Sequence, residues 1–335
     1  MSNQPPIEVP QGAIRLNTDS QRLEFFAQDR WYEMATDVPT LDGGARGLFA
    51  GGYAPSRSNV IDFITIAKTG NALDFGDLTA QKGWVFGAAS SRVRGVFAGG
   101  AAPSFSDIID FVTIASTGNA TDFGNMFDSR LAHAGCGNQT SGLFAGGNNE
   151  NTAGTKTNGI EFITIASTGN GLDFGDLASA TASLCGTASP TRGLFMGGYT
   201  PTALNTIQFV TIASTGNTQD FGNLTQARQE AAGCANSTRA ICAGGGPASG
   251  AQSSIDFFTI ATLGNAQNFG DLITALQSSM GATSSPTRGV ISTGTPNTNN
   301  LEYVSISAKG NSFDFGDLTQ SSHTGSACSN AHGGL

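Results

Sequence analysis

The chain has 335 residues, of which 46 are glycine and 22 are phenylalanine, while only 12% are charged and the formal net charge is −9. This content is too apolar and too weakly charged for a disordered polyelectrolyte. The acidic balance argues against a general nucleic-acid binder, which needs a basic face, and against an anionic membrane surface as a partner.

Residues 1–42 lie outside any repeat and predict two or three short strands. They contain Gly12-Ala-Ile-Arg-Leu-Asn-Thr-Asp-Ser, whose last four residues are typical of a turn, and then Asp29-Arg-Trp-Tyr-Glu-Met. The start lacks the basic and apolar regions of a secretory signal. No apolar run approaches the roughly 18 residues of a membrane helix. We therefore expect a separate β segment over 1–42, and a protein that is made in a cytoplasm and is not exported by the usual route.

From residue 43 onward, three motifs recur six times at intervals of 46 to 51 residues. The motif Thr-Gly-Asn-x-x-Asp-Phe-Gly-Asp-Leu has its first Asn at Asn71, Asn119, Asn170, Asn217, Asn265 and Asn311. The motif Arg-Gly-[Leu/Val]-Phe-Ala-Gly-Gly begins, with some degradation, at Arg46, Arg94, Ser141, Arg192, Arg239 and Arg288. The motif Ile-[Asp/Glu]-Phe-[Ile/Val]-Thr-Ile begins at Ile61, Ile109, Ile160, Ile207, Ile255 and, as Leu-Glu-Tyr, at Leu301.

Each unit predicts four short strands. A small-residue strand such as 231–235 comes first, the Arg-Gly motif second, the β-branched motif third and Asp-Phe-Gly-Asp-Leu last. Gly and Asn between the third and fourth strands suit a tight hairpin. The third strand is apolar on both faces, as neighbouring blades of a propeller require. The sequence thus predicts an all-β, six-bladed β-propeller over 43–335.

The two ends of this propeller are expected to meet. Residues 47–78 supply only the last three strands of a unit, and its first strand is missing there. The tail 324–335 matches a first strand and stops where the Arg-Gly motif would begin. We expect the tail to complete that blade, which leaves no exposed sheet edge.

The unit resembles the kelch repeat, in which a small-residue strand leads to a strand ending in Gly-Gly and two strands with aromatics follow. The Gly-Gly place is taken by 51–52, 99–100, 146–147, 197–198 and 244–245, and it degrades to Thr293-Gly294 in the sixth unit. The aromatic of the last strand is Phe, as at Phe75, where kelch repeats carry Trp. The resemblance is therefore to kelch-like blades, and it implies the propeller fold.

A second resemblance is to structural proteins of bacteriophages, notably marine and cyanobacterial ones. It is carried by Gly-x-Ile-Arg-x-Asn-Thr…Leu-Glu-x-[Phe/Tyr]…Trp over about 23 N-terminal residues, and by the repeat itself over 46–335. It implies a virion component, assembled in the host cytoplasm, with the N-terminal segment as anchor. It also implies a homo-oligomer, with a trimer favoured. The anchor and oligomer residues would be Ile14, Leu23, Phe25, Phe26, Trp31 and Tyr32.

Several recurring polar residues suggest chemistry but are better explained by structure. The Asp-Phe-Gly tripeptide recurs in almost every unit without any other protein-kinase motif, so we interpret it as structural. An acidic position in the third strand could pair with the recurring arginines, or both could bind backbone groups, and the sequence leaves these alternatives open. The acidic position comprises Asp62, Asp110, Glu161, Asp256 and Glu302, with Gln208 in the fourth unit.

No catalytic or metal site can be assembled from the sequence, and no cofactor is expected. His133, His323 and His332 are the only histidines, and no acid–base partner is suggested for any of them. A copper oxidase would need two His with Tyr and Cys ligands, and a sialidase a three-Arg cluster. The five cysteines are odd in number and include no C-x-x-C pair, so we expect buried thiols instead of disulfides or zinc ligands.

Length variation identifies the candidate binding surface. The step from the Gly-Gly pair to the third strand varies between units, whereas the other motifs keep their spacing. These loops join equivalent strands and should share one face, and loops on a rigid scaffold commonly carry recognition. Aromatic and Asn side chains suit carbohydrate or protein contacts. The candidates are Tyr53, Arg57, Phe105, Asn148, Asn149, Lys156 and Tyr199.

Three functions follow as hypotheses. The first is a phage tail appendage or fibre-type module that binds a host-surface glycan or protein through these loops. The second is a capsid decoration or a tail component that never touches the host. The third, less favoured, is a kelch-type oxidase. The first two imply other virion proteins as partners, without nucleic acid or membrane insertion.

Overall fold

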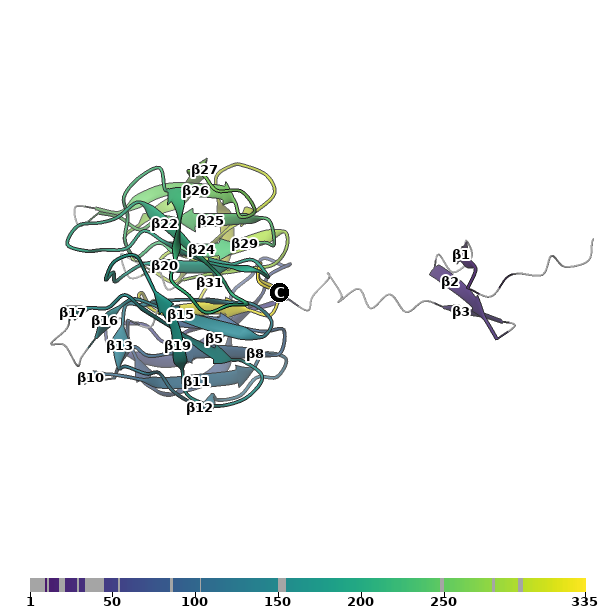
Figure 1. The fold of residues 1–335 in the computed structure, drawn as a ribbon, viewed down its shortest axis with the longest axis horizontal. Coiled ribbons are helices and arrows are strands. Elements are labelled where there is room, and N and C mark those ends of the chain that lie inside the picture. Colours follow the sequence, from purple (N-terminus) through teal and green to yellow (C-terminus); the bar gives the residue numbers. More distant parts are fainter. Residues whose placement is uncertain are drawn as a thin grey trace, which may run out of the picture. The chain divides into compact units, whose positions relative to one another are not determined.

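The computed structural model describes residues 10, 12–17, 22–28, 30–33, 45–53, 55–84, 87–102, 104–149, 155–247, 250–278, 281–294 and 298–335. Across these residues the regular elements are all β-strands (Figure 1). The described part contains no helix that could span a membrane. Contacts divide the chain into two compact units, residues 1–41 and 42–335.

The first unit is a three-stranded antiparallel sheet of β1 (Ile14–Asn17), β2 (Arg22–Ala27) and β3 (Arg30–Glu33). The rings of Phe26 and Trp31 meet edge to face, and the Arg15 guanidinium lies 4.1 Å from the centre of the Trp31 ring. Ile14 is 63% exposed. The predicted turn over 18–20 and the side chains of Leu23 and Phe25 lie outside the described residues.

The second unit contains, in its described part, six four-stranded antiparallel sheets, each built from the predicted repeat. The sheets are numbered along the chain, from the one that contains Arg46–Ala50 (first) to the one that contains Arg288–Ser292 (sixth and last). The first strands are β7 (Gly87–Ser90), β14 (Ala134–Gly137), β20 (Cys185–Ala188), β24 (Ala232–Ala235), β28 (Ala282–Ser284) and β32 (Ser326–Ser329). The second strands are β8 (Arg94–Ala98), β15 (Ser141–Ala145), β21 (Arg192–Met196), β25 (Arg239–Ala243), β29 (Arg288–Ser292) and β4 (Arg46–Ala50). The third strands are β11 (Ile108–Thr113), β18 (Gly159–Thr164), β22 (Thr206–Thr211), β26 (Gln252–Thr259), β30 (Asn300–Ser305) and β5 (Ser58–Thr65). The outer strands are β12 (Thr121–Asn125), β19 (Leu172–Asp176), β23 (Gln219–Asn223), β27 (Gln267–Leu276), β31 (Phe313–Asp317) and β6 (Leu73–Lys82).

The first strands contact one another in a ring. Their order is β7, β14, β20, β24, β28 and β32, and β32 contacts β7 again. They approach so closely that a Cβ added to Gly135 would lie 2.3 Å from the backbone N of Ala88. This explains why the first strands consist of Gly, Ala, Ser, Thr and Cys. The last of them, β32, pairs with β4 in the register Ser326 opposite Ala50, as the sequence of the tail predicts.

The apolar core is divided among the spaces between sheets. Six buried clusters each join two consecutive sheets, and one of them joins the last sheet to the first through Phe49, Ile64, Leu301 and Phe315. The third-strand aromatic packs edge-on against the outer-strand Phe, with Phe63 and Phe75 6.0 Å apart between ring centres. Equivalent pairs recur in the other five sheets. The Asp-Phe-Gly motif therefore supplies core aromatics.

The Thr-Gly-Asn turns attach each sheet to the outer strand of the preceding one. The Oδ1 of Asn119 accepts a hydrogen bond from the Asp77 N–H at 3.1 Å, and Gly118 N–H donates to Phe75 O at 2.8 Å. The same Asn-mediated bond recurs at Asn170, Asn217, Asn265, Asn311 and Asn71. An outer strand would otherwise present unpaired backbone groups, and these bonds occupy part of that edge.

The recurring arginines do not pair with the recurring acids. Each one stacks on the aromatic of its own third strand and donates to a backbone carbonyl of the next sheet, as Arg192 does over Phe209 and to Ile260 O at 2.6 Å. The equivalent donors are Arg46, Arg94, Arg239 and Arg288. Of the two interpretations left open by the sequence, the backbone one is therefore correct for these arginines.

Candidate binding face

Two sets of loops form one side of the second unit, which we call the loop face. One set joins second to third strands, and the other joins each outer strand to the next first strand. Bridges link the two sets around the face, pairing Tyr53 with His323, Ala101 with Gly83 and Tyr199 with Ala182. Figure 1 shows the short strands β10 (Ser104–Phe105), β13 (Arg130–Leu131), β16 (Asn148–Asn149) and β17 (Thr155–Lys156) of this face together, on the side away from the C-terminus. The predicted binding residues in these loops therefore share a face.

The face carries short strands of its own. Phe105 is half-buried in β10 (Ser104–Phe105), which pairs with β9 (Ala101–Ala102). Asn148 and Asn149 form β16 between β13 (Arg130–Leu131) and β17 (Thr155–Lys156). Asn149 is buried, so it supports the loop instead of presenting its amide to a ligand. The neighbouring residue 150 lies outside the described residues.

The predicted candidates form two clusters. The Nζ of Lys156 lies 4.9 Å from the centre of the Tyr199 ring, so this pair joins the third and fourth sheets. Tyr53 stacks on Trp84 with 5.5 Å between ring centres and an interplanar angle of 24°, and His323 meets Tyr53 edge-on at 5.8 Å. Arg57 bridges back to Tyr53. The second cluster thus combines side chains from the two loops that follow strands of the first sheet with His323 from near the end of the chain.

The recurring third-strand acids hold the loop face in place. Each accepts hydrogen bonds from the later part of the preceding outer strand or from the segment that follows it. Asp62, for example, accepts from the backbone N–H of Thr319 at 2.9 Å and from its hydroxyl at 2.7 Å. Gln208 does the same through its Oε1, which accepts from Ala178 N–H at 2.8 Å. The acids are therefore supports of the loops and are not exposed ligand contacts.

Three buried cations, which sequence reasoning missed, complete these supports. Lys82 pairs with Asp110 at 2.8 Å, Arg130 pairs with Glu161, and the Nη2 of Arg228 lies 3.4 Å from Asp256. Each cation lies five residues after the residue that follows Phe-Gly in the outer-strand motif. These preceding residues are Asp77, Asn125 and Asn223. The corresponding residue of the third sheet is Thr181, and its third-strand partner is the neutral Gln208.

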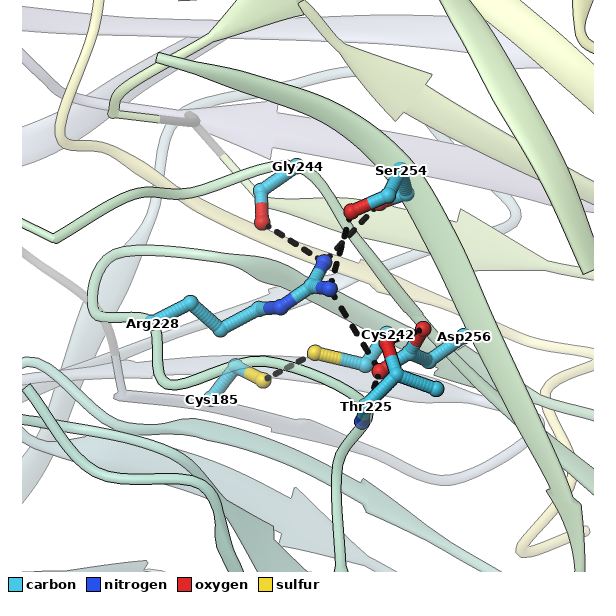
Figure 2. A network of polar contacts seen from close by, with 7 residues as sticks. All are labelled: Cys185, Thr225, Arg228, Cys242, Gly244, Ser254 and Asp256. Atoms are coloured by element: carbon cyan, nitrogen blue, oxygen red, sulfur yellow. Dashed lines mark hydrogen bonds and ion pairs between the residues drawn. The ribbon is translucent and has the colours of Figure 1, made fainter. Parts of the chain in front are cut away.

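Figure 2 shows the Arg228 support in detail. The guanidinium donates to Gly244 O at 3.1 Å, to Ser254 O at 2.8 Å and to the Ser254 hydroxyl at 2.9 Å. Asp256 also accepts from the hydroxyl of Thr225 at 2.7 Å. The guanidinium and its carboxylate are both fully buried, so the loop is held by charge-assisted bonds away from water.

Below this network, the Sγ atoms of Cys185 and Cys242 lie 3.7 Å apart as free thiols (Figure 2). The two residues belong to the fourth and fifth sheets. The hydrogen bond with the Cys242 thiol, together with burial, raises the pKa of Cys185 well above its ordinary value. All five cysteines are buried and free, which suits packing and not reaction.

Burial also shifts the pKa values of ionisable groups beneath the loop face. It lowers the pKa of the His133 imidazole to about 3, so this fully buried ring is neutral at physiological pH. It lowers the pKa of Arg130 to about 10, so the guanidinium keeps its charge beside Glu161. It also lowers the pKa of His323. In the described residues, no group of three or more His, Cys, Asp or Glu is placed to hold a metal ion.

The axis of the ring offers little space. A cavity of about 50 Å³ is lined by the first strands, which is room for only a few water molecules. The end of the chain lies against the turns opposite the loop face, where the Nε2 of His332 is 3.0 Å from Ser90 O. A Cβ added to Gly333 would lie 2.6 Å from Ala188 O. The tail therefore packs tightly against this side of the axis.

No protein-family model matches the chain, and a search of curated proteins found no match.

Proposed function

We propose that residues 43–335 form a six-bladed, kelch-like β-propeller closed by the C-terminal strand. Three observations support this proposal: the ring of first strands, the cores between consecutive sheets, and the pairing of β32 with β4. In such a fold each sheet is one blade, and the loop face is one end of the disc.

We further propose that this propeller is displayed on a phage virion, as a tail appendage or fibre-type module that binds a host-surface glycan or protein. The observation that carries the proposal is the contrast between two surfaces. The loop face gathers Tyr53 and Tyr199 from the loops of unequal length and Trp84 from the other set of loops, whereas the cavity at the ring axis is lined by the small side chains of the first strands and by His332. Rigid scaffolds that carry variable aromatic loops suit recognition.

The remainder of the chain has a different role in this proposal. Residues 1–42 attach the propeller to other virion proteins and hold copies of the chain together, with a trimer favoured. The exposed Ile14 and the ring pair Phe26–Trp31 are consistent with such a contact. The module needs no cofactor, carries out no catalysis, and reaches the particle in the host cytoplasm.

Immunogold labelling of intact particles from the source, with an antibody against the propeller, tests the proposal. Gold at tail tips or fibres is the expected result. Gold on the capsid would make the chain a decoration protein and contradict host recognition. Particles without gold would contradict a virion function altogether.

A further inference from the structure

The loop face contains six equivalent positions, and one of them differs in chemistry from the others that the structure describes. Where the first sheet has Tyr53, Arg57 and His323, the fourth sheet has Tyr199, Ala203 and Ala182 with the same bridges. Where the first sheet is followed by Trp84, the fourth is followed by Glu230. We call Tyr53, Arg57, Trp84 and His323 the seam site, because it lies where the two ends of the second unit meet.

The seam site is held rigidly by the backbone. The N–H of Tyr53 donates to His323 O at 2.8 Å, and the N–H of His323 donates to Tyr53 O at 3.3 Å. The edge of the His323 ring and the face of the Trp84 ring then fix the Tyr53 ring from two directions. All four side chains of the site are half-buried, so each keeps an accessible part. Aromatic surface that is fixed before binding lowers the entropy cost of recognition.

Trp84 occupies a backbone conformation that disfavours large side chains. Its φ is 51°, in the left-handed region, where bulky residues are outliers. The fold imposes this conformation at the equivalent positions too, but they carry smaller or more flexible residues: Ala132, Ser183, Glu230 and Thr324. A tryptophan here does not join a core cluster, so its strained position is better explained by contact with a ligand.

A polar hollow adjoins the aromatic stack. It is lined by Ser56, Arg57, Ser58, Asn59, Val60, Gln81, Gln320, Ser321 and Ser322. The Gln320 amide donates to the Ser58 hydroxyl at 2.6 Å, which ties the last sheet to the first across the hollow. Among the described residues, the lining has hydroxyls, amides and one guanidinium, and it includes no carboxylate. On a chain with a net charge of −9, this is a local site that favours an anion.

We propose that the seam site binds an acidic saccharide. The apolar face of a pyranose ring would lie on the Tyr53–Trp84 stack, and its hydroxyls would bond to the serine and amide groups of the hollow. The sugar carboxylate would face the guanidinium of Arg57, which matches carboxylate geometry. This inference rests on the proposed role of the loop face in recognition and specifies its ligand class.

The two tryptophans of the chain make a direct assay possible. Trp31 lies in the first unit, so in the full-length Trp31→Phe protein the intrinsic fluorescence reports on Trp84 alone. The probes are an array of uronic-acid oligosaccharides and their carboxyl-reduced counterparts, first screened by retention and then titrated. We expect the acidic member of a pair to bind at least about tenfold more tightly and to shift the Trp84 emission.

Matched variants locate the site. Tyr53→Ala and Arg57→Gln should each weaken binding about tenfold or more, and the Gln variant should lose the preference for acid. Leu263→Ala removes an exposed side chain from a turn between a third strand and its outer strand, outside the loop face, and should leave binding unchanged. Melting curves of all variants check that the fold is retained. Binding that Tyr53→Ala leaves unchanged, or that Leu263→Ala weakens as much as Tyr53→Ala does, would refute the seam site.

The remaining outcomes separate this inference from the proposed function. Equal binding of acidic and reduced saccharides would overturn the acidic ligand class. Binding of the full chain to host cells without retention of any saccharide would overturn the seam inference and keep host recognition. Absence of both cell and saccharide binding would overturn both proposals.

Discussion

The buried pair of Arg228 and Asp256 gives a sharp test of how the loops are supported, because the chain contains its own neutral alternative. In Asp256→Gln the guanidinium stays buried without an anion, which should lower the free energy of unfolding by about 3–5 kcal/mol. The double variant Arg228→Thr/Asp256→Gln copies the residues Thr181 and Gln208 of the neighbouring support. It removes the buried charge and should cost only about 1–2 kcal/mol for unsatisfied carbonyls.

Guanidinium-induced unfolding of the full-length wild type, both single variants and the double variant measures this coupling. The double variant should be more stable than Asp256→Gln by about 2 kcal/mol. If the two residues were independent, the losses in the free energy of unfolding of the single variants would add instead. The Gly244 and Ser254 carbonyls also lose their donor in Arg228→Thr, so that single variant controls for this effect. A double variant as unstable as Asp256→Gln would refute the reasoning, since the destabilisation would then not come from an unpaired charge.

Further predictions concern acid titration, the turns and the first unit. Burial raises the pKa of Asp62 above its ordinary 3.8, so the stability that this group contributes is present at low pH and is lost as the pH rises through the raised value. Asp62→Asn should therefore gain stability relative to wild type as the pH rises from about 3.8, and a constant difference across a pH series of unfolding curves would contradict this. Asn217→Ala removes the acceptor of the Asp176 N–H and should cost about 1 kcal/mol by denaturant unfolding, whereas an unchanged midpoint would show that the bond is dispensable. Phe26→Asp with Trp31→Asp should reduce the light-scattering mass of the full chain to that of a monomer, and equal masses would place the oligomer contact elsewhere.

Sequence reasoning predicted the parts of the fold that repeat. The all-β class and the four-stranded antiparallel sheets are confirmed, because turn and core residues such as Asn71 and Phe75 recur at every sheet and give a strong signal. The tail was predicted as a first strand for the same reason. The sequence left open whether the recurring arginines pair with the acids or bind backbone groups, because no side-chain pattern identifies the backbone carbonyls that are their partners.

The candidate site was harder to predict because it depends on what does not repeat. Tyr53 and Arg57 were found through loop length, but Trp84 and His323 belong to the other set of loops, whose spacing is more regular. The buried cations did leave one signal in the sequence. In the unit where the third-strand acid is replaced by the neutral Gln208, the residue at the cation position is the neutral Thr181. A comparison of the positions at which single repeats deviate would have identified Trp84 and these cations together.

The pairing of the last strand with the first sheet has a consequence for synthesis of the protein. Arg46 and Asn330 are hydrogen-bonded although 284 residues separate them, so β4 leaves the ribosome long before its partner exists. Until then the inner edge of β4 is an open template for another chain. A ring closed by its latest strand folds slowly, because the largest loop must close before that contact forms. Newly made chains should therefore be most prone to misassembly until β32 (Ser326–Ser329) emerges, and a helper that covers the β4 edge would raise the yield.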